Sequence, residues 1–243
     1  MTADFTLTGY RELIAAIVAR GYEIKNFAEV EAARPHLILR HDIDQCLRAA
    51  AELAALEAEQ GWRASYFVLV RSEMYNPFSP AGLRALEKIT QGGHEIGLHL
   101  DASLYGGDRA ALEAAAEREC AVLESITGQK ISMISFHRPA PGLMPFDHIL
   151  AGRSNAYESR FFNKIGYCSD SRGGWHHGHP LGHESLNAGR ALQLLTHAIW
   201  WIGGQASAQE KLTAYLDRRR SLLESELAEH CAAYTPRLTK EGT

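Results

Sequence analysis

The stretch LILRHDID (residues 37–44) joins a short apolar run of β-strand type to a charged end. Residues two apart in an extended segment project to the same side, so Asp42 and Asp44 face the same way. Two carboxylates that lie close together repel each other unless a cation or a proton separates them. The stretch therefore predicts a strand that ends in a site where one carboxylate binds a metal ion and the other acts as a base. A surface loop with two solvated acids is the alternative.

Apolar runs of strand type alternate with helical patterns on both sides of this stretch. The alternation predicts an α/β fold with a parallel sheet and helical crossovers. Ser79 and Pro80 mark a helix start, whereas Gly61 and Gly128 mark helix ends. The last helix has leucines on one face and is assigned to packing, without chemistry. The predicted strands are 37–42, 65–70, 95–100, 131–137 and 191–197, and the predicted helices are 8–20, 46–60, 80–91, 108–127 and 208–232.

The size and composition are those of one large globular domain. The 243 residues suit a single α/β domain (1–243) with its core at about 37–201. The net charge of -4 argues against a nucleic-acid binder, and four scattered cysteines predict reduced thiols. The chain has neither a signal-peptide pattern nor an apolar run long enough to span a membrane. We therefore expect a cytoplasmic protein without membrane insertion, and no feature of the sequence indicates its oligomeric state.

Polar residues gather at the C-terminal ends of the predicted strands. Asp42, His99, His137 and His197 each follow an apolar run. In barrels of parallel strands, this rim is where catalytic residues collect. His94 begins the strand that His99 ends, and their spacing places them on opposite faces. His99 is therefore the better metal ligand, and His94 is expected to be a turn or core histidine.

Seven segments of the chain, taken in order, resemble the polysaccharide deacetylase family, the carbohydrate esterases with a chitooligosaccharide-deacetylase homology domain. The resemblance is strongest to the R-H-D-x-D branch, which is associated with surface-polysaccharide biosynthesis. It implies a distorted (β/α) barrel of about seven parallel strands with one divalent metal ion. The segments are RHDID (40–44), ASYFV (64–68), MYN (74–76), GGHEIGLH (92–99), SFHRP (135–139), SDSRGGW (169–175) and LLTHAIWW (194–201).

The resemblance implies a role for each matching residue of the reaction centre. Asp42 is the general base, and Asp44 and His99 bind the metal ion. His197 is the general acid that protonates the departing amine. The family usually has a second metal histidine four residues after the first, where this chain has Ser103. The third metal ligand is therefore left open.

Three candidates remain for this third ligand. We expect His137, because it ends a neighbouring strand. Asp101, which is also a candidate substrate contact, is the second choice, and a water molecule is the third. Zinc is the metal that aspartate and histidine ligands favour, although nickel, cobalt or manganese would fit similar ligands.

Five further residues complete the predicted site. The resemblance implies that Arg138 orients the base, and its guanidinium group is shaped to hold a carboxylate. Asp170 and Trp175 match the segment that tunes the general acid and walls the pocket. Tyr75 and Asn76 are expected to contact sugar hydroxyls.

Two aromatic or histidine-rich features have no assigned role in this scheme. The segment HHGHPLGH (176–183) contains four histidines, which could form a second metal site or a loop that borders the pocket. Trp200 and Trp201 could stack on a sugar ring, with buried packing at a strand end as the alternative.

The function implied by the resemblance is a metal-dependent hydrolase that removes an N-acetyl or other acyl group from an amino sugar. The substrate would be an oligosaccharide or a carrier-linked precursor of a surface polysaccharide such as O-antigen. One alternative is a catalytically silent relative that binds a sugar or a metal ion. Another is a hydrolase of a non-sugar amide or a formyl group, because a fold does not determine the substrate.

Overall fold

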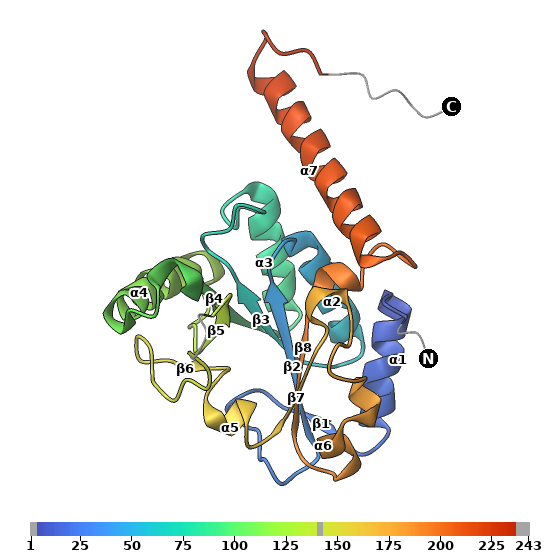
Figure 1. Ribbon diagram of the computed structural model, residues 1–243. Helices are drawn as coiled ribbons and strands as arrows, with labels where there is room; N and C mark the ends of the chain where they lie inside the picture. The colour runs from blue at the N-terminus through green and yellow to red at the C-terminus, as the bar shows by residue number, and fades with distance from the viewer. Residues whose placement is uncertain (1–3, 140–142, 237–243) are drawn as a thin grey trace. The chain divides into compact units, whose positions relative to one another are not determined.

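The computed structural model describes residues 4–139 and 143–236. The chain divides into two compact units, Met1–Gln205 and Ala206–Thr243, and the sheet belongs to the first (Figure 1). The second unit contains the helix α7 (Ala208–His230). That this helix belongs to a single domain with the core stays a prediction.

The first unit is built on a curled parallel sheet that forms a half-barrel (Figure 1). Its strands run in the order β6-β5-β4-β3-β2-β8-β7, and the short β1 pairs with β2. All of these pairs are parallel, which confirms the predicted α/β fold with a distorted (β/α) barrel. The strands are β1 (Glu23–Ile24), β2 (His36–Ile43), β3 (Ser65–Val68), β4 (Glu95–Asp101), β5 (Met133–His137), β6 (Ser154–Asn155), β7 (Gly166–Ser169) and β8 (Leu192–Thr196).

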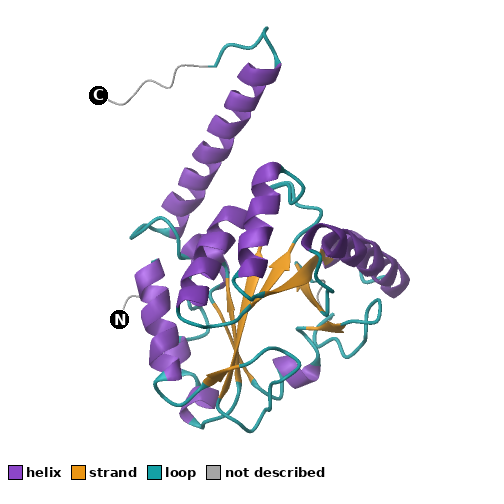
Figure 2. Ribbon diagram, turned by 180° about the vertical axis from the view of Figure 1, so that it is seen from behind, coloured by secondary structure: helices purple, strands orange, loops and turns teal. Residues whose placement is uncertain are grey.

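Four helices cover the outer face of this sheet, and Figure 2 shows them beside the strands. Each packs on the next along the chain, and three of them also contact β2 or β4. The predicted capping residues are in place: the Ser79 side chain accepts a hydrogen bond from the Gly82 N–H, and Gly128 ends its helix with a φ of 67°. The four are α1 (Leu7–Val18), α2 (Leu47–Glu59), α3 (Pro80–Gln91) and α4 (Arg109–Thr127).

The sequence pattern missed the shortest elements. β1 and β6 have two residues each, which is too short for a hydrophobic period to be recognised, and the four residues of β7 lie in the irregular stretch that follows the strand at 131–137. The other short elements are α5 (Ser159–Phe162), α6 (Glu184–Asn187) and the 3₁₀ turns Ala102–Tyr105, Ser171–Gly173, Pro180–Gly182 and Ala198–Trp200.

The central strand β2 has different chemistry on its two faces. All eight of its residues are buried. Because successive side chains of a strand alternate, Ile38, Arg40 and Asp42 share one face and His41 points the opposite way. Ile38 joins the apolar core cluster that also contains Phe67. Along this face of β2, the apolar core at Ile38 is therefore followed by the charged pair Arg40 and Asp42.

The opposite face of β2 is fixed to the helices by a buried polar cluster around Glu57 of α2. The Glu57 carboxylate accepts hydrogen bonds from the hydroxyls of Tyr10 and Tyr66 and lies 2.9 Å from His41 Nε2. His41 Nδ1 lies 2.7 Å from the Thr196 hydroxyl of β8. Burial alone would raise the pKa of Glu57, but the combined effect of His41, His94 and the Tyr10 hydrogen bond outweighs burial and the pKa is lowered. The cluster therefore joins α1, α2 and three strands through one carboxylate.

None of the helices within residues 4–139 and 143–236 has the length and apolar character that crossing a bilayer requires.

We expect Glu57→Ala to lower the free energy of unfolding by about 3–5 kcal/mol, because it leaves buried partners of the carboxylate unpaired. The matched control is Glu52→Ala on the same helix, whose carboxylate is 39% exposed and pairs with Arg48. This control should change stability by less than about 0.5 kcal/mol. Urea-induced unfolding measures both values, and equal stabilities for the two variants would contradict the structural role of the cluster.

Candidate metal and catalytic site

The predicted reactive residues meet at the C-terminal ends of the strands. Asp42 is the penultimate residue of β2, His99 lies on β4, His137 ends β5 and His197 follows β8 directly. Because neighbouring strands are parallel, these ends share one rim of the half-barrel. The residues line a pocket of about 690 Å³, together with Asp44.

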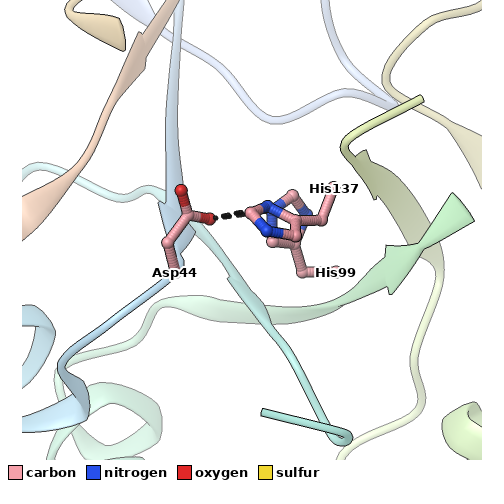
Figure 3. A group of neighbouring side chains, drawn as sticks. All are labelled: Asp44, His99 and His137. Carbon is pink, nitrogen blue, oxygen red and sulfur yellow. Dashed lines mark hydrogen bonds and ion pairs between the residues drawn. The ribbon is translucent and has the colours of Figure 1, made fainter. Parts of the chain in front are cut away.

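Asp44, His99 and His137 form a group that can hold a metal ion. Asp44 Oδ1 lies 3.1 Å from His99 Nε2 and 3.2 Å from His137 Nδ1. One ligand atom from each residue lies within 4.8 Å of the other two, and Figure 3 shows the side chains pointing toward one another. Two imidazole nitrogens and one carboxylate oxygen, with room for further ligands in a pocket, are a donor set that suits catalytic zinc.

Neighbouring groups orient His99 and keep Asp44 ionised, as binding of a cation requires. The Ser135 hydroxyl lies 2.5 Å from His99 Nδ1, so the other ring nitrogen, Nε2, is turned toward Asp44. Such contacts to the far nitrogen fix the orientation of metal-binding histidines. Burial would raise the pKa of Asp44, but the hydrogen bonds with His137 and His99 outweigh it and hold that pKa well below its usual value. Asp44 is thus a carboxylate anion at neutral pH.

Asp101, the second candidate for the third ligand, has other partners. Its carboxylate is ion-paired with Arg138 and accepts a hydrogen bond of 2.6 Å from the Ser103 hydroxyl. It therefore lies outside the group of converging ligand atoms, whereas His137 lies within it. Ser103, at the position where the family has a second histidine, serves to hold Asp101.

The arginine that holds Asp42 is Arg40, and not Arg138 as the resemblance implied. Arg40 Nε and Nη2 donate to the two carboxylate oxygens of Asp42 at 2.9 and 2.7 Å, and Arg40 is fully buried. Burial would raise the pKa of Asp42, but the charge and hydrogen bonds of Arg40, together with the charges of His99 and His197, outweigh burial and the pKa is lowered. The physical reason is strand alternation, which places residues 40 and 42 on one face. This alternation is the sequence signal that could have identified Arg40.

Arg138 occupies a different environment. Its side chain is 63% exposed at the pocket and is ion-paired with Asp101. Its backbone has a φ of 48°, a left-handed conformation that is uncommon for residues other than glycine. Non-glycine residues held in such conformations are often found at functional sites.

The side chain of His197 is held in place by Asp170. His197 Nδ1 lies 2.7 Å from Asp170 Oδ1, and Nε2 lies 3.8 Å from Asp44 Oδ2. Asp170 also accepts hydrogen bonds from the His197 backbone N–H and, at 2.8 Å, from the Trp201 indole. Burial would lower the pKa of His197, but Asp170 outweighs it and raises the pKa to about 9. A protonated ring nitrogen is thus directed at the metal-ligand group.

The four predicted substrate contacts are not among the pocket-lining residues. The Tyr75 hydroxyl is buried, donating to the Ile43 carbonyl at 2.7 Å and accepting from the Leu69 N–H. Asn76 is exposed and caps the Phe78 N–H. Tyr75 thus ties the loop after β3 to the end of β2, and Asn76 satisfies a backbone group of that loop, a competing role for such residues in turns.

Asp101 and Trp175, the other two predicted substrate contacts, also interact with other side chains of the protein. Asp101 pairs with Arg138 as described above, and Trp175 packs on aromatic rings. The centroid of the Trp175 ring lies 5.9 Å from that of Phe5 and 6.1 Å from that of Trp201. Trp175 therefore supports the residue that donates to Asp170.

The walls of the pocket come largely from residues that the sequence pattern did not select. Most of these residues lie between residues 138 and 190, where the hydrophobic period is irregular, so no repeating signal could have identified them. They are Met144, Tyr157, Phe162, Tyr167 and Arg172, and they are joined by Phe136 and Leu195 of two predicted strands. Trp200, a candidate for stacking on a sugar ring, also lines the pocket, whereas the Trp201 indole donates to Asp170.

His94 and two histidines of the loop at residues 176–183 make hydrogen bonds with backbone groups. His94 is a core histidine, 1% exposed, with Nε2 2.9 Å from the Ala54 carbonyl. In the histidine-rich loop, His179 and His183 use Nδ1 to accept backbone N–H groups at 3.3 and 3.1 Å. Within the described part of the chain, the group of Asp44 with two histidines is the one set of side chains placed for a metal ion.

No family model and no curated protein sequence matches the chain. Similar solved structures include a family 4 carbohydrate esterase from Bacillus anthracis, with 15% identity over 87% of this chain and 86% of that one, at a TM-score of 0.43. IcaB from Ammonifex degensii has 13% identity over 54% of this chain and 65% of that one, at a TM-score of 0.42. A family 4 acetyl xylan esterase from Clostridium thermocellum, in complex with a cobalt ion, has 13% identity over 76% and 83%, at a TM-score of 0.41.

Family 4 carbohydrate esterases, the class that the sequence resembles, are thus among the structural neighbours of the chain. Identities and TM-scores this low do not identify an activity, which has to be inferred from the side chains of the site.

We expect the purified protein to bind about one zinc ion per chain, and His137→Ala to lose it, because an imidazole ligand is removed. His177→Ala, which changes an exposed histidine of the loop, is the matched control and should keep the ion. Elemental analysis after dialysis against zinc measures the content. Full zinc retention in His137→Ala would contradict the assignment of this residue as the third ligand.

Proposed function

We propose that the protein is a metal-dependent hydrolase that removes an N-acetyl group from an amino sugar. The observation that carries the proposal is one pocket that combines a metal-ligand group, an ionised carboxylate and a protonated imidazole. Asp42 lies 3.8 Å from the metal ligand His99, and His197 lies 3.8 Å from the metal ligand Asp44. A general base and a general acid on either side of a metal ion are the groups that amide hydrolysis requires.

The two flanking residues divide the proton transfers between them. A metal ion bound to Asp44, His99 and His137 supplies Lewis acidity, which lowers the pKa of a water molecule and polarises the acyl carbonyl. The Asp42 carboxylate, held by Arg40, accepts the proton of the attacking water. His197 donates the proton on Nε2 to the departing amine nitrogen, while Asp170 holds Nδ1. An amide nitrogen leaves poorly without such a proton, so the acid is as necessary as the base.

The pocket walls favour a substrate with a negative group. Arg172 and Arg138, the latter ion-paired with Asp101, both line the pocket with exposed side chains, and both have positive φ values, of 62° and 48°. Arginine is well suited to phosphate and carboxylate groups because its planar group donates two parallel hydrogen bonds. We therefore place a carrier-linked amino sugar, with phosphate beside the sugar, ahead of a neutral oligosaccharide. Zinc as the metal, a surface-polysaccharide precursor as the substrate and a cytoplasmic location are predictions from the sequence that the proposal adopts.

We expect the zinc-loaded protein to release acetate from N-acetylglucosamine 1-phosphate, with a lower KM than for free N-acetylglucosamine. His197→Ala should lower kcat by about 10²–10⁴-fold, because the leaving amine loses its proton donor. His177→Ala is the control of unchanged activity, and acetate is quantified in a coupled assay. Turnover of a formylated or non-sugar amide instead would support the hydrolase activity but assign it a different substrate. No turnover of any member by a protein with bound zinc would contradict the proposal.

We expect kcat/KM to fall as pH rises through the pKa of His197, because the general acid must be protonated. The Asp170 carboxylate outweighs burial in raising this pKa to about 9. Asp170→Asn removes the negative charge, so the pKa falls and the alkaline limb of the pH profile moves to lower pH. Profiles of kcat/KM for the wild type and the variant measure this displacement. An alkaline limb at the same pH in both proteins would show that His197 is not the titrating acid.

A further inference from the structure

The helix α7 presents large apolar side chains that its own unit does not cover. Leu216, Leu222, Leu223 and Leu227 are 65%, 48%, 55% and 50% exposed. Within the described part of its unit, residues 206–236, α7 is the one helix and no strand accompanies it. A single helix cannot bury an apolar face by itself, and most helical stability in proteins comes from packing such a face. The leucines of α7 therefore need a partner surface.

The leucines follow the spacing of a coiled-coil seam. Leu212, Leu216 and Leu223 recur at intervals of four and seven residues, which returns them to one side of a helix. Two charged residues, Arg219 and Glu226, lie on the same side, seven residues apart. Charged residues within a seam set the orientation and register of the partner helix, because they must meet opposite charges.

The charges of α7 are divided between its two halves. Residues 208–220 contain four basic and two acidic side chains, whereas residues 221–230 contain three glutamates and no lysine or arginine. The C-terminal end of a helix carries partial negative charge, so the glutamates there do not stabilise an isolated helix. The division does suit a partner helix that runs in the opposite direction and has the same sequence.

We propose that α7 pairs in antiparallel orientation with α7 of a second copy of this chain. In this arrangement the basic half of each copy lies along the acidic half of the other, which brings Arg219 near Glu226. A parallel pair in register would instead place Arg219 against Arg219 and Glu226 against Glu226. Like charges across a seam are destabilising, so the antiparallel pair is the one that the sequence of α7 supports.

The test is the mass of the full-length protein in solution, measured by sedimentation equilibrium over a range of concentrations. The wild type should have twice the chain mass of 26.9 kDa. Leu216→Glu combined with Leu223→Glu should be a monomer, whereas Leu83→Glu, which changes a 40% exposed leucine of α3, should remain a dimer. A wild type that stays monomeric, or a dimer that survives the double leucine change, would overturn the proposal.

A charge exchange tests the orientation without removing apolar surface. Arg219→Glu should weaken the dimer about tenfold or more in Kd, because two glutamates then meet at each crossing contact. Adding Glu226→Arg should restore the wild-type Kd, because the opposite charges are exchanged. A double variant as weak as the single one would overturn the antiparallel pair. Zinc content, measured in parallel, should be unchanged in every variant, so this result is independent of the proposed hydrolase activity.

Discussion

The buried ion pair between Arg40 and Asp42 is the interaction on which the site depends. Removing two charges from water costs several kcal/mol per ion unless the pair has good geometry and further hydrogen bonds. Here the pair is bidentate, Arg40 also donates to Tyr157 and Gln193, and its guanidinium lies 4.6 Å from the centroid of the Tyr157 ring. These contacts hold Asp42 as an anion in the middle of the sheet. Asp42, the proposed base, is therefore held in one orientation by Arg40.

Strand alternation links this pair to the rest of the fold. One face of β2 holds Arg40 and Asp42, and the opposite face holds His41 against the Glu57 carboxylate. A slip of one residue in the pairing of β2 would exchange the two faces and carry Arg40 and Asp42 together to the side of the helices. The cluster around Glu57 and the catalytic rim thus constrain the same register from opposite sides. One strand therefore carries both residues that stabilise the fold and residues of the proposed reaction centre.

The sequence predicted what depends on local periodicity and on the ends of strands. The parallel α/β architecture followed from alternating patterns. His99 and His137 were proposed as metal ligands because each follows an apolar run, and the structure brings them together with Asp44. The arginine of Asp42 was misassigned to Arg138, because the resemblance was followed where alternation on β2 would have been decisive. Tyr75 was predicted to contact a sugar, and its hydroxyl instead bonds to the backbone of Ile43 and Leu69, which sequence spacing does not reveal. The pocket walls depend on tertiary packing of irregular segments, which leaves no periodic signal.

The most direct test of a metal-dependent reaction centre is the position of the metal ion itself. Crystals soaked in zinc, with diffraction recorded on both sides of the zinc absorption edge, locate the ion by anomalous scattering. The account predicts one strong peak bonded to Asp44, His99 and His137, with zinc–nitrogen distances of about 2.0–2.1 Å. A peak elsewhere, for example at the histidines of residues 176–183, or no peak at the three ligands, would contradict it.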